Sequence, residues 1–333
     1  MQHALAKYSA ADVVIVAACG ERAGEAVEVF KEFPALVDPR TGNSLMDRTY
    51  IVGNTSSMPV AAREASVYIA VSVGEYYRKQ GLNVLMLADS TSRWAQALRE
   101  TSGRKEEIPG PEAFPMYIST LIAAFYDRAG NEVLPDGSRG SLSIVGTVSP
   151  AGGNFDEPVT QATLLCTGAF WGLSRALSDA RKYPAIDRIE STSQYPSLLD
   201  EREVAKAKEL LADGKVIASN IILMGEKGVT DETYIRYQQA ELFDAVFLQQ
   251  DAFHEVDGVT SPSRLRMMFD MAWRIVQSPV AIKGKQEIRT HFNYLRQAFI
   301  DWNMLPIDDE RFEKQSKVIL NLIKQGEHDS ENV

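Results

Sequence analysis

The sequence has few cysteine and histidine residues, and their positions exclude several kinds of site. Only Cys19 and Cys166 occur among 333 residues, too few for a disulfide framework or a zinc site. The four histidines are scattered, and none is spaced from another as metal ligands are. No Ser/His/Asp or Cys/His arrangement is visible. The sequence therefore disfavours a hydrolytic triad and suits a reducing compartment.

Long apolar runs and an excess of basic residues are also missing. The sequence has no run of about 18 uncharged apolar residues, as a membrane span requires, and it does not open with a signal-peptide pattern. Lys and Arg total 35 against 45 Asp and Glu, so the net charge is −10, which argues against general nucleic-acid binding. We therefore expect a soluble, cytoplasmic protein with no direct membrane insertion and no nucleic-acid partner.

Among the features that are present, the stretch at residues 82–93, LNVLMLADSTSR, is the most informative. Its apolar run at 84–87 is too short for a buried helix and fits a central parallel strand covered on both faces. Asp89 ends the run, and ligands of open α/β sheets collect beyond the carboxyl ends of the strands. Two interpretations stay open at this point: Asp89 serves Mg²⁺ beside a phosphate, or it caps the following helix.

A second apolar run, at residues 12–18, ends in the same way. Glu21 and Arg22 follow it directly before an expected helix at 23–30, so they too lie at the carboxyl end of a strand. A carboxylate there can act as a general base for water, and a guanidinium can bind phosphate. The alternative is a surface pair that only begins a helix.

Strands and helices alternate through the first part of the chain, which predicts an α/β fold with a parallel sheet. Further strands are expected at 50–53 and 141–147, with helices at 60–80, 94–100 and 116–130. From about residue 196 the apolar spacing is helical throughout. We therefore expect a nucleotide-binding domain over 1–198 and an all-α C-terminal bundle over 199–333.

Four motifs stand out along the chain: GERAGE at 20–25, NTSSMPVAARE at 54–64, LMLADSTSRWAQALRE at 85–100 and SPAGGNFDEPVTQATL at 149–164. Together they resemble one family, the catalytic A subunit of the V/A-type rotary ATPases. The likeness covers nearly the whole chain, is dense between 12 and 200, and is looser in the helical part, as in FLQQDAF at 247–253. It implies a RecA-like P-loop NTPase sheet with flanking helices.

The resemblance also implies roles for five residues. Glu21 matches the carboxylate that polarises the attacking water, and Arg22 matches an arginine that contacts the terminal phosphate. Asp89 matches the Walker B aspartate, which binds Mg²⁺ through water. Tyr183 and Phe253 match the aromatic residues on either side of adenine, a role that suits flat apolar faces. For both aromatics the alternative is a core position.

One departure from the family pattern is large. The phosphate-binding motif G-x-x-x-x-G-K-[ST] occurs nowhere in the 333 residues, and the chain starts inside the helix that should follow it. The resemblance therefore implies a nucleotide-binding domain truncated at its N-terminus. Because phosphoryl transfer depends on positioning and charge, we expect this chain alone to be inactive.

In the intact subunit, the resemblance implies ATP hydrolysis or synthesis coupled to proton or sodium transport across a membrane. Implied ligands are ATP or ADP with Mg²⁺, and implied partners are the B subunits of a hexameric ring and central stalk subunits, in a cytoplasmic sector peripheral to the membrane. The alternative is a naturally short, non-catalytic assembly module. An in-frame phosphate-binding loop in the genome upstream of Met1 would favour the first hypothesis, and a stop codon the second. GER followed by SPAGGNFDEPVT disfavours a third possibility, the B subunit.

Overall fold

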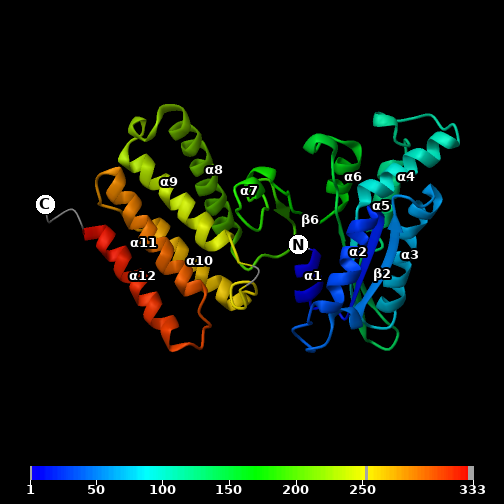
Figure 1. Cartoon of the computed structure of the whole chain (residues 1–333), viewed down its shortest axis with the longest axis horizontal. Coiled ribbons are helices and arrows are strands. Elements are labelled where there is room, and N and C mark those ends of the chain that lie inside the picture. Colours follow the sequence, from blue (N-terminus) through cyan, green and yellow to red (C-terminus); the bar gives the residue numbers. More distant parts are fainter. Residues whose placement is uncertain (1, 252–253, 329–333) are drawn as a thin grey trace. The chain divides into compact units, whose positions relative to one another are not determined.

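The computed structural model describes residues 2–251 and 254–328 and divides the chain into two compact units, Met1–Gly168 and Ala169–Val333. Figure 1 labels the elements of both. The first unit contains a five-stranded sheet, and the second contains the long C-terminal helices. The predicted fold class, a parallel sheet with flanking helices followed by a helical region, is confirmed.

The sheet of the first unit has the strand order β2-β1-β3-β5-β4. Its strands are β1 (Val13–Glu21), β2 (Thr49–Thr55), β3 (Asn83–Asp89), β4 (Gly130–Val133) and β5 (Arg139–Gly146). β3 lies at the centre, as predicted, with β1 and β5 parallel to it on either side. β4 pairs antiparallel with β5. The sequence-based expectation of a helix over 116–130 was too long and missed β4, because α5 (Ile118–Tyr126) ends before the strand begins.

Both faces of the sheet are covered, which explains the unbroken apolar runs of β1 and β3. The helices of this unit are α1 (Gln2–Tyr8), α2 (Ala23–Glu32), α3 (Val60–Arg78), α4 (Thr91–Arg104), α5 (Ile118–Tyr126) and α6 (Pro158–Cys166). Its 3-10 turns are η1 (Phe33–Ala35), η2 (Leu45–Arg48), η3 (Pro111–Ala113) and η4 (Ala151–Gly153). Along β1, Ile15 and Ala17 pack with helices α3 to α6, whereas Val14 and Val16 pack against α1 and the short turns η1 and η2.

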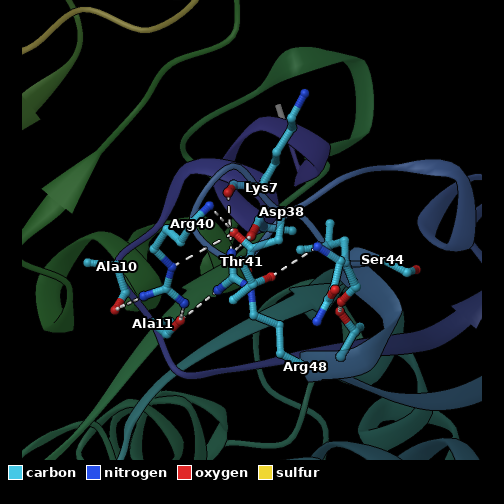
Figure 2. A network of polar contacts seen from close by, with 12 residues as sticks. Lys7, Ala10, Ala11, Asp38, Arg40, Thr41, Ser44 and Arg48 are labelled. Carbon is cyan, nitrogen blue, oxygen red and sulfur yellow. Dashed lines mark hydrogen bonds and ion pairs between the residues drawn. The ribbon is translucent and has the colours of Figure 1, made fainter.

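A buried ion pair ties the loop before β2 to the end of α1. Asp38 is only 1% exposed, and its Oδ2 lies 2.8 Å from Nε of Arg48. The Arg48 guanidinium also donates to the carbonyls of Ala6 (2.9 Å) and Ala11 (2.6 Å). Arg40 donates its backbone N–H to Asp38 and its guanidinium to Ala11. This network, shown in Figure 2, satisfies carbonyls that the last turn of a helix leaves without partners.

The second unit is mainly a bundle of long helices. Its elements are β6 (Ala169–Phe170), α7 (Arg175–Asp179), β7 (Thr192–Ser193), α8 (Glu201–Met224), η5 (Glu226–Gly228), α9 (Asp231–Phe243), the π-helical turn η6 (Asp244–Leu248), α10 (Pro262–Gln277), α11 (Lys285–Asn303) and α12 (Glu310–His328). Asp200 starts α8 with a capping box that includes Glu203. The predicted boundary at residue 198 marks the change to helices, while the compact units divide earlier, after Gly168. The division into functional domains at 198 stays a prediction.

Candidate active site

Glu21 is placed by an irregularity at the end of β1. The register between β1 and β2 shifts between Cys19 and Glu21, so Gly20 bulges out of the ladder. Gly20 has φ +73°, and a Cβ there would lie 2.7 Å from Cδ of Arg63. Only glycine fits this position without displacing Arg63. The bulge ends the ladder with Glu21, half-buried, at the carboxyl edge of the sheet.

Asp89 lies at the same edge, at the end of the adjacent strand β3. In the parallel ladder between β3 and β1, Asp89 is the partner of Ala18. One carboxylate oxygen accepts a hydrogen bond from Thr147 Oγ1 (2.7 Å) and the other from Gln2 Nε2 (2.6 Å). The N-cap of α4 is Ser90 and not Asp89. The structure therefore does not support the capping interpretation of Asp89, and its role as a Mg²⁺ ligand stays a prediction.

The charges around Glu21 alter its acidity. Burial, a hydrogen bond with Glu25 and the negative charges of Asp89 and Glu25 together raise the pKa of Glu21 to about 7, while Arg93 opposes the shift. A carboxyl with a pKa near neutrality is suited to general acid–base chemistry. The structure thus brings Glu21 and Asp89 into one electrostatic site.

Sequence reasoning missed Glu25 and Arg93. Glu25 lies in the first turn of α2, four residues after Glu21, and Arg93 lies in the first turn of α4, four residues after Asp89. Glu25 and Arg93 each lie about one helical turn after the residue that ends a strand. This shared spacing was the signal in the sequence that could have identified them as neighbours of the site. The spacing alone does not show that the two side chains meet at Glu21.

Arg22 is exposed and is the N-cap residue of α2, with its carbonyl accepting from Glu25 and Ala26. This matches the alternative in which the residue begins a helix. It also leaves the guanidinium in solvent at the edge where Glu21 ends β1. Its predicted contact with a terminal phosphate stays a prediction.

The two predicted adenine residues belong to the second unit. Tyr183 is 53% exposed, so the core alternative does not apply to it. Its carbonyl accepts a hydrogen bond from the backbone N–H of Gln250 (3.1 Å). Phe253 lies outside the described residues. The backbone contact places the Tyr183 loop beside Gln250.

Comparison with known families decides the family of this chain. The model of the ATP synthase alpha/beta family, nucleotide-binding domain, matches residues 1–193, more than half of the chain. The chain belongs to the ATP synthase alpha/beta family. The resemblance found in the motifs is thereby confirmed.

Curated relatives of this family member are V-type ATP synthase alpha chains. The protein of Borrelia turicatae is 53% identical over 329 residues, which are 99% of this chain and 57% of the relative. That of Borreliella burgdorferi is 51% identical over 97% of this chain and 56% of its own length. The chain therefore spans little more than half the length of these relatives.

Two solved structures share the fold of this chain at low sequence identity. The ATP synthase subunit NeqB from Nanoarcheaum equitans superposes with a TM-score of 0.69 at 22% identity, over 83% of this chain and 66% of the other. The ATPase EscN of the enteropathogenic E. coli type III secretion system gives a TM-score of 0.68 at 24% identity, over 81% and 63%.

The donor set at the sheet edge of this family member fits Mg²⁺. Among the described residues, no group of three or more His, Cys, Asp or Glu side chains could enclose a metal. Mg²⁺ does not require such a cage, because beside phosphates it is bound by one or two carboxylates and keeps several waters. Asp89, with the Thr147 hydroxyl bonded to it, supplies hard oxygen atoms of this kind.

We predict that Glu25→Gln lowers the pKa of Glu21. The substitution removes a negative charge, and removes the carboxyl whose hydrogen bond raises that pKa. Carboxyl ¹³C shifts of labelled glutamate, followed across a pH titration of this chain, measure the change. Glu28→Gln, on the same exposed side of α2, is the matched control and should leave the midpoint of Glu21 near 7. An unchanged midpoint in Glu25→Gln would show that Glu25 does not contribute to the raised pKa of Glu21.

Proposed function

We propose that this chain is part of the catalytic A subunit of a V/A-type ATPase or ATP synthase. The observation that carries the proposal is the position of Glu21, with its raised pKa, and Asp89 at the ends of adjacent strands, close enough for the charge of Asp89 to raise the pKa of Glu21. In an open α/β sheet this is the edge where nucleotide ligands bind. The similarity to V-type ATP synthase alpha chains supports the same assignment.

Within this proposal each side chain has a separate task. Glu21, ionised above about pH 7, accepts a hydrogen bond from the attacking water and orients it. Arg22 and its positive charge face the terminal phosphate, where a guanidinium can bind two oxygens. Asp89 would hold Mg²⁺, and the ion would supply positive charge that neutralises the phosphates. Tyr183 and Phe253 take the adenine ring between them.

The proposal extends to the assembly. The complete subunit would alternate with B subunits in a hexameric ring around central stalk subunits and couple ATP turnover to proton or sodium movement. The sector would be cytoplasmic and peripheral to the membrane. Within residues 2–251 and 254–328, no helix has the length and apolar character to cross a bilayer. The net charge of −10 supports partners other than nucleic acid.

We predict that the 333-residue chain has no measurable ATPase activity and binds nucleotide weakly at best. No G-x-x-x-x-G-K-[ST] motif occurs in it, so the backbone cradle, lysine and hydroxyl that position the phosphates are not supplied by these residues. Titration with a fluorescent ATP analogue tests the prediction. Mg²⁺-dependent binding at micromolar concentration or tighter would contradict it.

Activity is expected once the missing groups are supplied. A chimera in which these residues replace the matching segment of the Borrelia turicatae alpha chain should hydrolyse ATP when assembled with its partners. The 53% identity over 329 residues makes the exchange feasible. A chimera that assembles but hydrolyses no ATP would instead support a non-catalytic module.

A further inference from the structure

Asp244 is a nearly buried carboxylate that binds two cations. It begins the π-helical turn η6 and is 7% exposed. One of its oxygens lies 3.0 Å from Nζ of Lys182, and the other lies 3.0 Å from Nη2 of Arg188. A buried carboxylate is costly unless it is paired, and Lys182 and Arg188 supply the pairing here.

The two cations lie on either side of Tyr183 in the sequence. Lys182 precedes it directly, and Arg188 follows a few residues later, beyond the Tyr183–Pro184 bond. Burial lowers the pKa of Lys182, but the charges and hydrogen bonds of Asp244 and Glu241 together more than offset this, so that pKa is raised and the ammonium stays charged. Glu241 lies 3.3 Å from the same ammonium. One carboxylate of the bundle therefore fixes both ends of the loop that carries Tyr183.

A second connection passes through the glutamines after η6. Gln249 donates its side-chain amide to Asp244 Oδ2 (3.1 Å), and the backbone N–H of the next residue, Gln250, donates to the Tyr183 carbonyl (3.1 Å). The backbone of Tyr183 is thus fixed by the same group of contacts, while its side chain remains half exposed. A fixed backbone with an exposed ring is the arrangement needed to present an aromatic face to a ligand.

We propose that Asp244 is the positioning residue of the adenine site, acting through Lys182 and Arg188 on the Tyr183 ring without touching the nucleotide. This inference rests on the proposed function, in which Tyr183 stacks on adenine. Holding the ring in place before binding removes the entropy cost of ordering the loop when adenine arrives. Loss of the Asp244 charge therefore weakens base binding while Tyr183 itself remains.

The test is a double-mutant cycle on adenosine binding to this chain. Adenosine carries no phosphate, so its affinity reports the base site without the phosphate cradle. Saturation-transfer NMR titrations give the dissociation constants for the unchanged chain, Tyr183→Ala, Asp244→Asn and the double variant. We expect Tyr183→Ala to weaken binding by about tenfold or more, the scale of base stacking, and Asp244→Asn to weaken it by roughly fivefold. The double variant should bind no more weakly than Tyr183→Ala.

Two controls separate positioning from folding. Asp213→Asn breaks another ion pair of the bundle, with Arg236 at 3.0 Å, and should leave adenosine affinity unchanged. If Asp244→Asn does not fold, Lys182→Gln replaces it in the double-mutant cycle. This substitution removes the ion pair between Lys182 and Asp244 by changing the more exposed of the two side chains.

The outcomes distinguish this inference from the proposed function. No effect of Tyr183→Ala would overturn the adenine site itself, and the role of Asp244 with it. A loss with Tyr183→Ala but none with Asp244→Asn, or losses that add in the double variant, would overturn the positioning role alone. Non-additive losses, with Asp213→Asn unchanged, would support it.

Discussion

Glu21→Gln, made in a complete subunit that carries these residues, should slow ATP hydrolysis by roughly 10²-fold or more, the usual scale for removing a general base. Nucleotide affinity should remain close to that of the unchanged subunit, because the amide keeps the size of the side chain. Glu21 is well suited to the base role. With a pKa of about 7, its carboxyl group is ionised in much of the protein at neutral pH and in most of the protein at higher pH. Steady-state turnover of the assembled complex and a separate nucleotide titration measure the two quantities.

Asp89→Asn provides the contrast to Glu21→Gln. If Asp89 serves Mg²⁺, its loss should weaken binding of the Mg²⁺–nucleotide complex itself and not only the chemical step. Loss of binding in Glu21→Gln would mean that Glu21 has a structural role at the end of β1. If both variants showed the same defect, the separate roles proposed for the two carboxylates would be wrong.

Asp38→Asn should lower the free energy of unfolding of the first unit by about 3–5 kcal/mol, the scale for breaking a buried ion pair. Asp38 is almost completely buried. The substitution removes its negative charge and leaves the Arg48 guanidinium without its charge partner. Figure 2 shows that the same guanidinium reaches the carbonyls at the end of α1, so the disruption extends to that helix. Amide hydrogen exchange of the β1 core, residues 14–17, reports this free energy.

Asp47→Asn is the matched control for Asp38→Asn. It makes the same chemical change in η2, next to Arg48, at an exposed side chain. Surface substitutions of this kind change stability by about 0.5 kcal/mol or less. Equal effects of the two substitutions would show that the buried pair contributes nothing beyond its desolvation cost.

Local sequence patterns determined much of the first unit. The apolar runs of β1 and β3 predicted central strands because a parallel strand buried on both faces cannot alternate with polar residues. The ends of those runs located Glu21 and Asp89 at one edge, since parallel strands share their carboxyl side. β4 was missed because a four-residue edge strand has no period of its own to recognise.

Only the tertiary structure decided the electrostatics. The pKa of Glu21 depends on burial and on Glu25, Asp89 and Arg93, which come from different elements, and sequence distance does not measure a charge–charge distance. In the second unit, Asp244 meets Lys182 and Arg188 across more than fifty residues of sequence. The sequence by itself identified Glu21, Arg22 and Asp89 as candidates for the chemistry. Folding decided which of them share a site, because Coulomb interactions and desolvation depend on positions in space and not on order along the chain.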